Sequence, residues 1–224
     1  MYKGQSITVI IPCLNEEQGI EKVLRAMPQF VDEVIVVDNN STDRTSDVAR
    51  SLGAKVIREE VRGYGRAYKR GFAAATSDII ITLDGDHSYP VDALSYLIEA
   101  LLHLEVDFLS ASRFPVRDAH AMSLKNKFGN LILSAFMSIL FFRWVRDSQS
   151  GMWVFRRVIL KEMKLESDGM SFSEEVKIEA LRHPRIRFGE INIQYSSRMG
   201  ETKLNPWRDG LYNLSFLLKK RFFR

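Results

Sequence analysis

Short runs of β-branched and apolar residues alternate with helical patterns through the first half of the chain. Five of these runs are predicted strands: residues 7–11, 33–38, 55–58, 79–84 and 108–112. Between them, residues 17–27, 42–52, 65–75 and 91–104 have the length and periodicity of crossover helices. Strands joined by such helices pair in parallel, so the pattern predicts an α/β fold with a mainly parallel sheet flanked by helices.

The second half of the chain has a less regular pattern. We expect an apolar helix at residues 125–142, a polar loop at 146–151, a helix at 173–181 and a strand at 186–195. A basic loop at 196–204 follows, and Pro206 then opens a terminal helix, where the missing N–H of proline costs nothing.

That terminal helix is predicted to be amphipathic. Its apolar residues recur at helical spacing: Trp207, Leu211, Leu214, Leu218 and Phe222. Its opposite face is polar: Arg208, Asp209, Asn213, Lys220 and Arg224. We therefore divide the chain into one domain at residues 1–204 and a basic amphipathic helix at 205–224. We expect this helix to lie on an anionic membrane surface, and the alternatives are that its apolar stripe packs on the body of the domain or on a membrane-spanning partner subunit.

Composition narrows the possible settings and partners. The chain has 224 residues, 46% of them hydrophobic, enough for the core of a single domain. Cys13 is the only cysteine, and the N-terminal residues lack the apolar region of a signal peptide, so we expect a cytoplasmic protein. The longest apolar run, residues 131–142, is shorter than the roughly 20 residues of a spanning helix. No nucleic-acid-binding motif appears, so nucleic acid is not an expected partner.

Candidate chemistry lies where predicted strands end, because ligands of open parallel sheets bind beyond the carboxyl ends of the strands. Asp84, Gly85 and Asp86 form a turn after an apolar strand. Two adjacent carboxylates suit Mg²⁺ or Mn²⁺, which prefers oxygen ligands and bridges carboxylates to phosphates. The same tripeptide would also fit a turn that caps the next helix.

Gly63 and Gly65 precede a predicted helix and are a weaker signal. Glycines at a helix start can let free N–H groups approach a phosphate. A dinucleotide-binding fingerprint needs a third glycine and normally follows the first strand, and no phosphate-binding P-loop is present. Redox and P-loop nucleotidase functions are therefore disfavoured.

The first two predicted strands end in the sequences VIIPCLNE (residues 9–16) and VIVVDNNSTD (residues 34–43). With the Asp-Gly-Asp turn, these resemble family 2 glycosyltransferases. The resemblance implies a Rossmann-like GT-A fold in which residues 1–112 form the nucleotide-sugar half and residues 113–204 the acceptor half. It implies that the donor is bound by Pro12, Leu14, Glu16, Val36, Asp38, Asp84, Gly85 and Asp86. In this resemblance Asp38 accepts hydrogen bonds from the base.

Three later motifs narrow the resemblance: ASR (residues 111–113), DSQSGM (147–152) and YSSRMGETKL (195–204). In this order they are similar to polyprenyl-phosphate glycosyltransferases of the dolichol-phosphate mannosyltransferase type. The resemblance implies donor contacts at Arg113, Arg198 and Lys203, and acceptor-phosphate contacts at Arg113, Lys127 and Ser148. Ser88 takes the place of a frequent glutamine among the metal ligands, and Lys127 that of an arginine.

The resemblance implies inverting, metal-dependent transfer of a sugar from a nucleotide diphosphate sugar, GDP-mannose or a UDP-sugar, to a polyprenyl (dolichyl) phosphate. Asp86, Arg198 and Lys203 would stabilise the leaving diphosphate, while Asp147 would order the acceptor loop or, with a hydroxyl acceptor, act as the base. Two alternatives remain: transfer to a soluble hydroxyl acceptor, and a non-catalytic nucleotide-sugar-binding subunit of a membrane complex. In each case we expect a peripheral position on the cytoplasmic face of a membrane.

Overall fold

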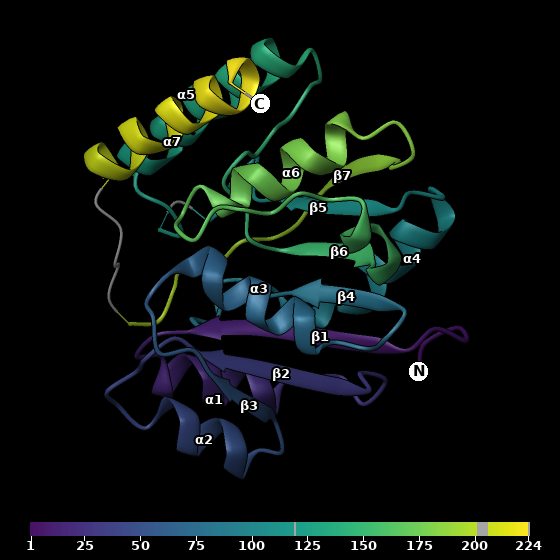
Figure 1. The fold of residues 1–224 in the computed structure, drawn as a ribbon. Coiled ribbons are helices and arrows are strands. Elements are labelled where there is room, and N and C mark those ends of the chain that lie inside the picture. Colours follow the sequence, from purple (N-terminus) through teal and green to yellow (C-terminus); the bar gives the residue numbers. More distant parts are fainter. Residues whose placement is uncertain (119, 201–205, 224) are drawn as a thin grey trace.

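One seven-stranded sheet forms the centre of the molecule (Figure 1). The structure is a computed structural model that describes residues 1–118, 120–200 and 206–223. The strand order is β3-β2-β1-β4-β6-β5-β7. The strands are β1 (Ile7–Cys13), β2 (Glu33–Asp38), β3 (Lys55–Arg58), β4 (Ile79–Thr82), β5 (Phe108–Ser112), β6 (Trp153–Arg156) and β7 (Phe188–Asn192). The predicted α/β fold with a mainly parallel sheet is confirmed.

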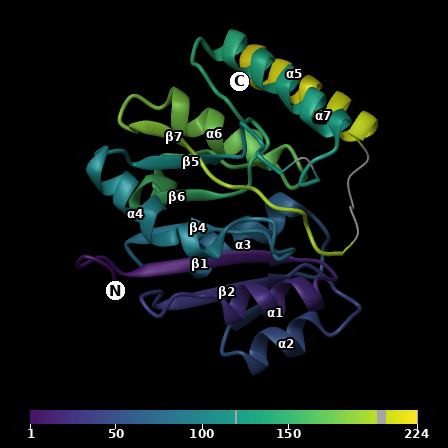
Figure 2. The ribbon, with the colours of Figure 1, turned by 180° about the vertical axis from the view of Figure 1, so that it is seen from behind.

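Helices cover both faces of the sheet (Figures 1 and 2). They are α1 (Glu17–Arg25), α2 (Thr45–Ser51), α3 (Tyr64–Ala74), α4 (Leu94–His103), α5 (Leu124–Phe141), α6 (Phe172–Arg182) and α7 (Pro206–Phe222), with short 3₁₀ turns at Val91–Ala93 and Arg157–Lys161. Helices α1, α2 and α4 pack on one face, and α3 and α6 pack on the other.

Strand β1 reads as a continuous apolar run because both of its faces are buried. Ile7, Val9 and Ile11 face the core shared with α1 and α4. Ile10 points the other way, into the core that contains Tyr68 and Phe72 of α3. The period-two alternation of side chains across a strand therefore supplies two hydrophobic cores from one segment.

The sequence pattern did not predict β6. This four-residue strand pairs antiparallel with β4 on one side and with β5 on the other. It follows a loop rather than a crossover helix, so the reasoning that identified the parallel strands does not apply to it. Strand β7 is also shorter than the predicted span of residues 186–195.

Helices α5 and α7 lie side by side at the end of the molecule beyond β7 and α6 (Figures 1 and 2). Leu133 and Met137 of α5 and Leu217 of α7 share a small core with Ile178 of α6. The terminal helix is thus present as expected, and one side of it packs on the domain, which was one of the arrangements expected. None of the described helices is both long and apolar enough to cross a membrane.

Candidate active site

The loops after β1 and β2 are bound together by hydrogen bonds. The amide of Asn15 donates to the Ser41 hydroxyl at 3.0 Å, and the Asn15 side-chain oxygen accepts from the amide of Thr42 at 2.7 Å. The amide of Glu16 donates to the Thr45 hydroxyl at 2.9 Å. The two strand-end motifs that suggested nucleotide-sugar binding therefore form one surface.

Asp38 lies at the carboxyl end of β2 and is buried. It accepts hydrogen bonds from the Ser41 amide at 2.8 Å, from the Ser46 hydroxyl and from Arg58 at 3.2 Å. Burial by itself would raise the pKa of Asp38, but these hydrogen bonds and the charge of Arg58 lower it below the ordinary value. A nucleotide base bound here would donate to an ionised carboxylate that already accepts hydrogen bonds from three protein donors.

The turn after β4 carries the two carboxylates predicted to bind metal. Asp86 is buried and Asp84 partly buried. A side chain at Gly85 would place its Cβ 2.6 Å from the Cys13 sulfur, so only glycine fits between them. Burial and the nearby charge of Asp86 raise the pKa of Asp84 to about 7, against the opposing effects of Arg113, Arg198 and a 3.2 Å hydrogen bond from Tyr64. The neighbouring arginines and Tyr64 therefore do not fully offset the cost of ionising Asp84 beside Asp86.

Ser88 holds Asp86 rather than facing a cation position. Its hydroxyl donates to Asp86 Oδ1 at 2.5 Å, its amide donates to the same oxygen at 3.0 Å, and the side chain is fully buried. Among the described residues no cluster of three or more histidine, cysteine, aspartate or glutamate side chains could hold a metal ion. The Ser88 hydroxyl is therefore engaged with Asp86, which leaves Asp84 and Asp86 as the candidate metal ligands.

Arg198 places a positive charge beside these carboxylates. Its Nη2 lies 3.3 Å from Asp86 Oδ2 and 3.4 Å from Glu16 Oε1. The backbone on either side is bound to the β4 turn, because the amides of Ser196 and Met199 donate to the carbonyls of Ser88 at 3.0 Å and Asp86 at 2.9 Å. A guanidinium stands where a divalent cation would be attracted, so the donor set fits Mg²⁺ or Mn²⁺.

Arg113 and Asp147 form a buried bidentate pair. Both Arg113 Nε and Nη2 donate to Asp147 at 2.8 Å, and the Arg113 amide donates at 3.0 Å. Asn130 also donates to Asp147, at 2.7 Å, and the Tyr195 ring lies 5.4 Å from the guanidinium. Burial would raise the pKa of Asp147, but Arg113 holds it well below its usual range. A carboxylate held ionised in this way is a poor base, and the pair uses two of the five N–H donors of the Arg113 guanidinium.

Other predicted residues occupy different surroundings. Pro12 is partly buried near the end of β1, Leu14 is partly buried just after it, and Lys127 is partly buried on α5. Val36 is fully buried in the core beneath the sheet surface, so its side chain does not reach a donor. Ser148 is also fully buried, with its hydroxyl 3.2 Å from that of Ser134, and does not face an acceptor. Lys203 lies outside the described residues.

The glycines before α3 serve packing instead of phosphate binding. The Gly63 amide donates to the Asn39 side chain at 2.7 Å, and the Gly65 amide donates to the Asp168 carbonyl at 2.9 Å. A Cβ at Gly65 would lie 2.7 Å from that of Phe172. The hydrogen-bonding groups that would meet a phosphate are already used.

Sequence reasoning missed Tyr64 and Lys177. Tyr64 donates to Asp84, and the ammonium of Lys177 donates to the backbone of the loop at residues 146–151. Tyr64 stood inside a motif considered only for its glycines. Lys177 gave no signal, because a lysine in a charged helix ordinarily faces solvent.

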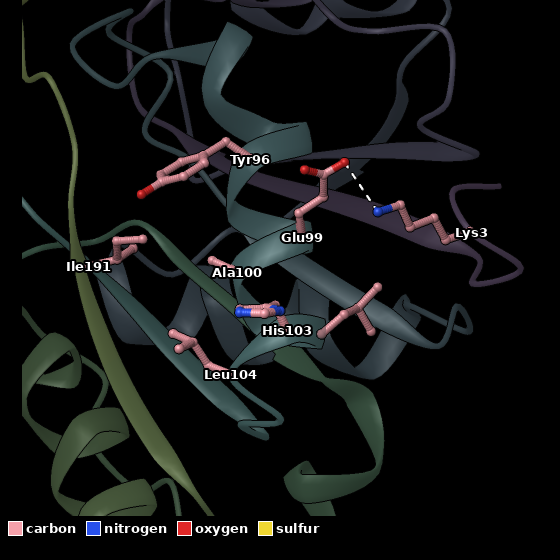
Figure 3. Close-up of a pocket in the computed structure, with 8 residues that line it drawn as sticks. Lys3, Tyr96, Glu99, Ala100, His103, Leu104 and Ile191 are labelled. Carbon is pink, nitrogen blue, oxygen red and sulfur yellow. Dashed lines mark ion pairs between the residues drawn. The ribbon is translucent and has the colours of Figure 1, made fainter.

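A groove elsewhere on the molecule is separate from this site. It lies along α4, near residues that precede β1, whereas the site lies beyond the other end of that strand (Figure 3). Figure 3 shows Lys3 paired with Glu99 beside Tyr96 and His103. The Lys3 ammonium lies 3.3 Å from the Glu99 carboxylate. None of the predicted site residues lines it.

Known structures share this fold. Glucosyl-3-phosphoglycerate synthase from Mycobacterium tuberculosis, in complex with Mn²⁺, UDP and phosphoglyceric acid, has a TM-score of 0.74 at 25% identity, over 97% of this chain and 78% of that one. The same protein in complex with Mg²⁺ and UDP gives a TM-score of 0.73 at 24% identity, over 97% and 79%. The chain therefore has the GT-A architecture expected from the resemblance.

Sequence comparisons identify the family. A relative in Haloferax volcanii, named dolichyl-phosphate hexose transferase, is 33% identical over 216 residues, covering 93% of this chain and 91% of its own. The low-salt glycan biosynthesis hexosyltransferase Agl6 of the same organism is 31% identical over 95% of this chain and 53% of its own. The family model for glycosyl transferase family 2 matches residues 8–164. The chain therefore belongs to glycosyl transferase family 2 and is a glycosyltransferase.

Proposed function

We propose that this enzyme transfers a sugar from a nucleotide diphosphate sugar, GDP-mannose or a UDP-sugar, to a polyprenyl (dolichyl) phosphate, with inversion at the anomeric carbon. The observation that carries the choice of acceptor is the state of Asp147. It is the predicted base for a hydroxyl acceptor, yet it is fully buried, ionised and bound to Arg113. A phosphate monoester ionises for a second time near pH ~6 and needs no base at neutral pH.

In this proposal the donor base and ribose lie against the loops that follow β1 and β2, near Pro12, Leu14, Glu16 and Asp38. Asp84 and Asp86 would hold Mg²⁺ or Mn²⁺, which supplies charge neutralisation for the departing diphosphate. An acceptor phosphate oxygen forms the new bond to the anomeric carbon as the bond to the diphosphate breaks. Arg198 moves from Asp86 to the diphosphate, together with Lys203.

The acceptor phosphate would lie beside Arg113 and Lys127, and the lipid chain would run along the α5–α7 pair. Both helices leave large apolar side chains exposed: Leu124, Phe128, Leu131 and Ile139 on α5, Phe142 directly after it, and Leu211, Leu218 and Phe222 on α7. Exposed basic residues accompany them, including Arg143 and Lys219. This combination favours an anionic bilayer surface, and we place the enzyme peripherally on the cytoplasmic face of a membrane.

A soluble hydroxyl acceptor is the second candidate. It is favoured by the fold shared with glucosyl-3-phosphoglycerate synthase, whose complexes contain phosphoglyceric acid. A non-catalytic subunit is disfavoured by the retained carboxylates and by Arg198 beside them.

Radiolabelled transfer distinguishes these acceptors. Purified enzyme with Mn²⁺, labelled GDP-mannose or UDP-glucose, and vesicles containing a polyprenyl monophosphate should yield a labelled, acid-labile glycolipid. D86N should reduce the yield by about a hundredfold or more, because a metal ligand is lost at nearly constant volume. The exposed Asp92 offers a matched control in D92N, which should behave as wild type. Unchanged labelling in EDTA, or label that reaches only a hydroxyl acceptor, would refute the proposal.

A further inference from the structure

Lys177 of α6 has a fully buried side chain that donates to the acceptor loop, defined here as residues 146–151. Its Nζ donates to the carbonyl oxygen of Asp147 at 2.6 Å and to that of Ser150 at 2.9 Å. Both contacts are to the backbone, near the two ends of the loop. A buried ammonium is costly to desolvate, so one placed here is expected to have a specific role.

Oppositely charged anchors hold the loop from two elements. Glu190 of β7 accepts hydrogen bonds from the amides of Arg146 at 2.7 Å and Asp147 at 3.2 Å. Lys177 of α6 donates to the carbonyl oxygens of Asp147 and Ser150. Burial lowers the pKa of Lys177 to about 8, against the charges of Asp147, Glu190 and Glu174, while Arg113 lowers it further. The ammonium therefore remains mainly protonated at neutral pH.

The position of the loop determines the position of Arg113. The Asp147 carboxylate binds the Arg113 guanidinium through two 2.8 Å hydrogen bonds. The Ser150 carbonyl also accepts from the Trp153 indole at 2.8 Å, which ties the loop to the start of β6. A shift of the Asp147 backbone would thus be transmitted directly to the guanidinium.

We propose that Lys177 is a positioning residue that fixes the acceptor loop, and through Asp147 fixes Arg113, in the geometry that receives the acceptor phosphate. This inference rests on the proposed polyprenyl-phosphate acceptor. The hydrogen bonds of Lys177 go to the backbone of the acceptor loop and not to the loops after β1 and β2. Its loss should impair the acceptor step and spare nucleotide binding.

The test compares K177M, which keeps the length of the side chain but removes its donors, with wild type. With a short-chain polyprenyl phosphate in detergent, kcat/KM for the acceptor should fall about tenfold to a hundredfold. The Kd of UDP and of GDP in Mn²⁺ should stay within about twofold. Hydrogen exchange of the amides in residues 146–151 should accelerate. K177Q, which can donate to one carbonyl, should recover part of the acceptor kcat/KM and also serves if K177M folds poorly.

Lys220 provides a matched control. It is also buried and lies against α6, but its ammonium pairs with Glu175 at 2.7 Å and Glu179 at 3.2 Å instead of the loop. K220M should lower the Tm yet leave acceptor kcat/KM and exchange of the loop unchanged. Equal kinetic losses in K177M and K220M, or wild-type acceptor kinetics in K177M, would overturn the inference.

The two proposals fail separately. If wild-type enzyme transfers sugar to no polyprenyl phosphate, the proposed function is wrong. Loop exchange still tests the anchoring by itself, because it needs no acceptor. Unchanged exchange in K177M would reject the positioning role whatever the acceptor is.

Discussion

Asp38, Asp84 and Asp147 are all aspartates, yet their different surroundings shift their pKa values in different directions. Hydrogen bonds and a neighbouring arginine lower the pKa of Asp38 and of Asp147 despite burial. Asp84 lies beside another carboxylate, and burial raises its pKa to about 7. These opposite pKa shifts indicate different roles. Asp38 and Asp147 stay ionised, whereas the ionisation of Asp84 would respond to a bound cation.

The raised pKa of Asp84 predicts how stability depends on pH without metal. An acid whose folded-state pKa exceeds its unfolded value binds protons more tightly when folded, so its contribution to stability is lost as pH rises from about 4 towards about 7. Wild-type protein in EDTA should lose about 1–3 kcal/mol more than D84N between pH 5 and pH 8. Denaturant unfolding at four pH values measures this difference.

Added Mn²⁺ supplies the control for that experiment. It should stabilise wild-type protein at pH 8 more than at pH 5, because the cation competes with a proton at Asp84. Identical pH dependence of wild type and D84N in EDTA would contradict the assigned pKa.

Sequence predicted where the carboxylates lie but not what holds them. Asp84 and Asp86 were identified because they follow an apolar strand, and the structure places them together beside Arg198. Ser88 and Ser148 were predicted to face ligands but lie buried: Ser88 bonds its near neighbour Asp86, whereas the surroundings of Ser148 come from a distant segment. Ser148 is enclosed by Ser134 of α5, fourteen positions earlier.

At the scale of helices and strands, periodic segments were predicted best. Helices α1 and α3 begin within one residue of their expected starts because their helical patterns are bounded by clear turns. Strand β6 was missed because it follows a polar loop and pairs antiparallel, so no crossover helix marks it in the sequence. Strand β6 pairs with both β4 and β5, and the local sequence does not indicate that these two strands lie on either side of it.

The faces of α7 separate as predicted only in part. Leu211 and Phe222 of the apolar stripe are exposed by 69% and 67%. From the polar face, Asn213 and Lys220 are turned inward, where Asn213 donates to Gln149 at 3.0 Å. Lys220 is therefore not available to lipid headgroups, and the basic contribution falls to residues such as Lys219.

Substitutions on the exposed apolar face of α7, which contains Leu211, Leu218 and Phe222, test membrane docking without disturbing the core. Leu218→Ser with Phe222→Ser should reduce cosedimentation with phosphatidylglycerol vesicles by about tenfold or more, because two large apolar groups lose their burial in lipid. High salt should weaken the binding of wild type as well.

Val158 gives a matched control on a distant turn, where it is 62% exposed. V158S should sediment as wild type does, and all three proteins should bind UDP alike. If the double variant also sediments as wild type does, the α7 face is not the contact with lipid.

For the whole molecule, the sheet order explains how distant motifs meet. Strands β1, β2 and β4 bring their carboxyl ends together from parallel neighbours, which is why three separate motifs in the first half of the chain could be joined by sequence reasoning. The second half joins the same sheet through β6, β5 and β7 with mixed directions. The sequence predicted the acceptor loop itself, but its anchors, Lys177 and Glu190, depend on that arrangement and were not visible in the sequence.

The inward face of α7 has a consequence for how the family diverges. Asn213 contacts the acceptor loop through Gln149, and Lys220 neutralises Glu175 and Glu179. In an alignment of relatives that retain this helix, positions 213 and 220 should covary with 149, 175 and 179. Outer positions such as 211, 218 and 222 should drift independently among apolar residues, since a fluid bilayer imposes hydrophobicity but no shape. If the inward positions varied as independently as the outer ones, the packing of α7 on the domain would not be maintained among these relatives.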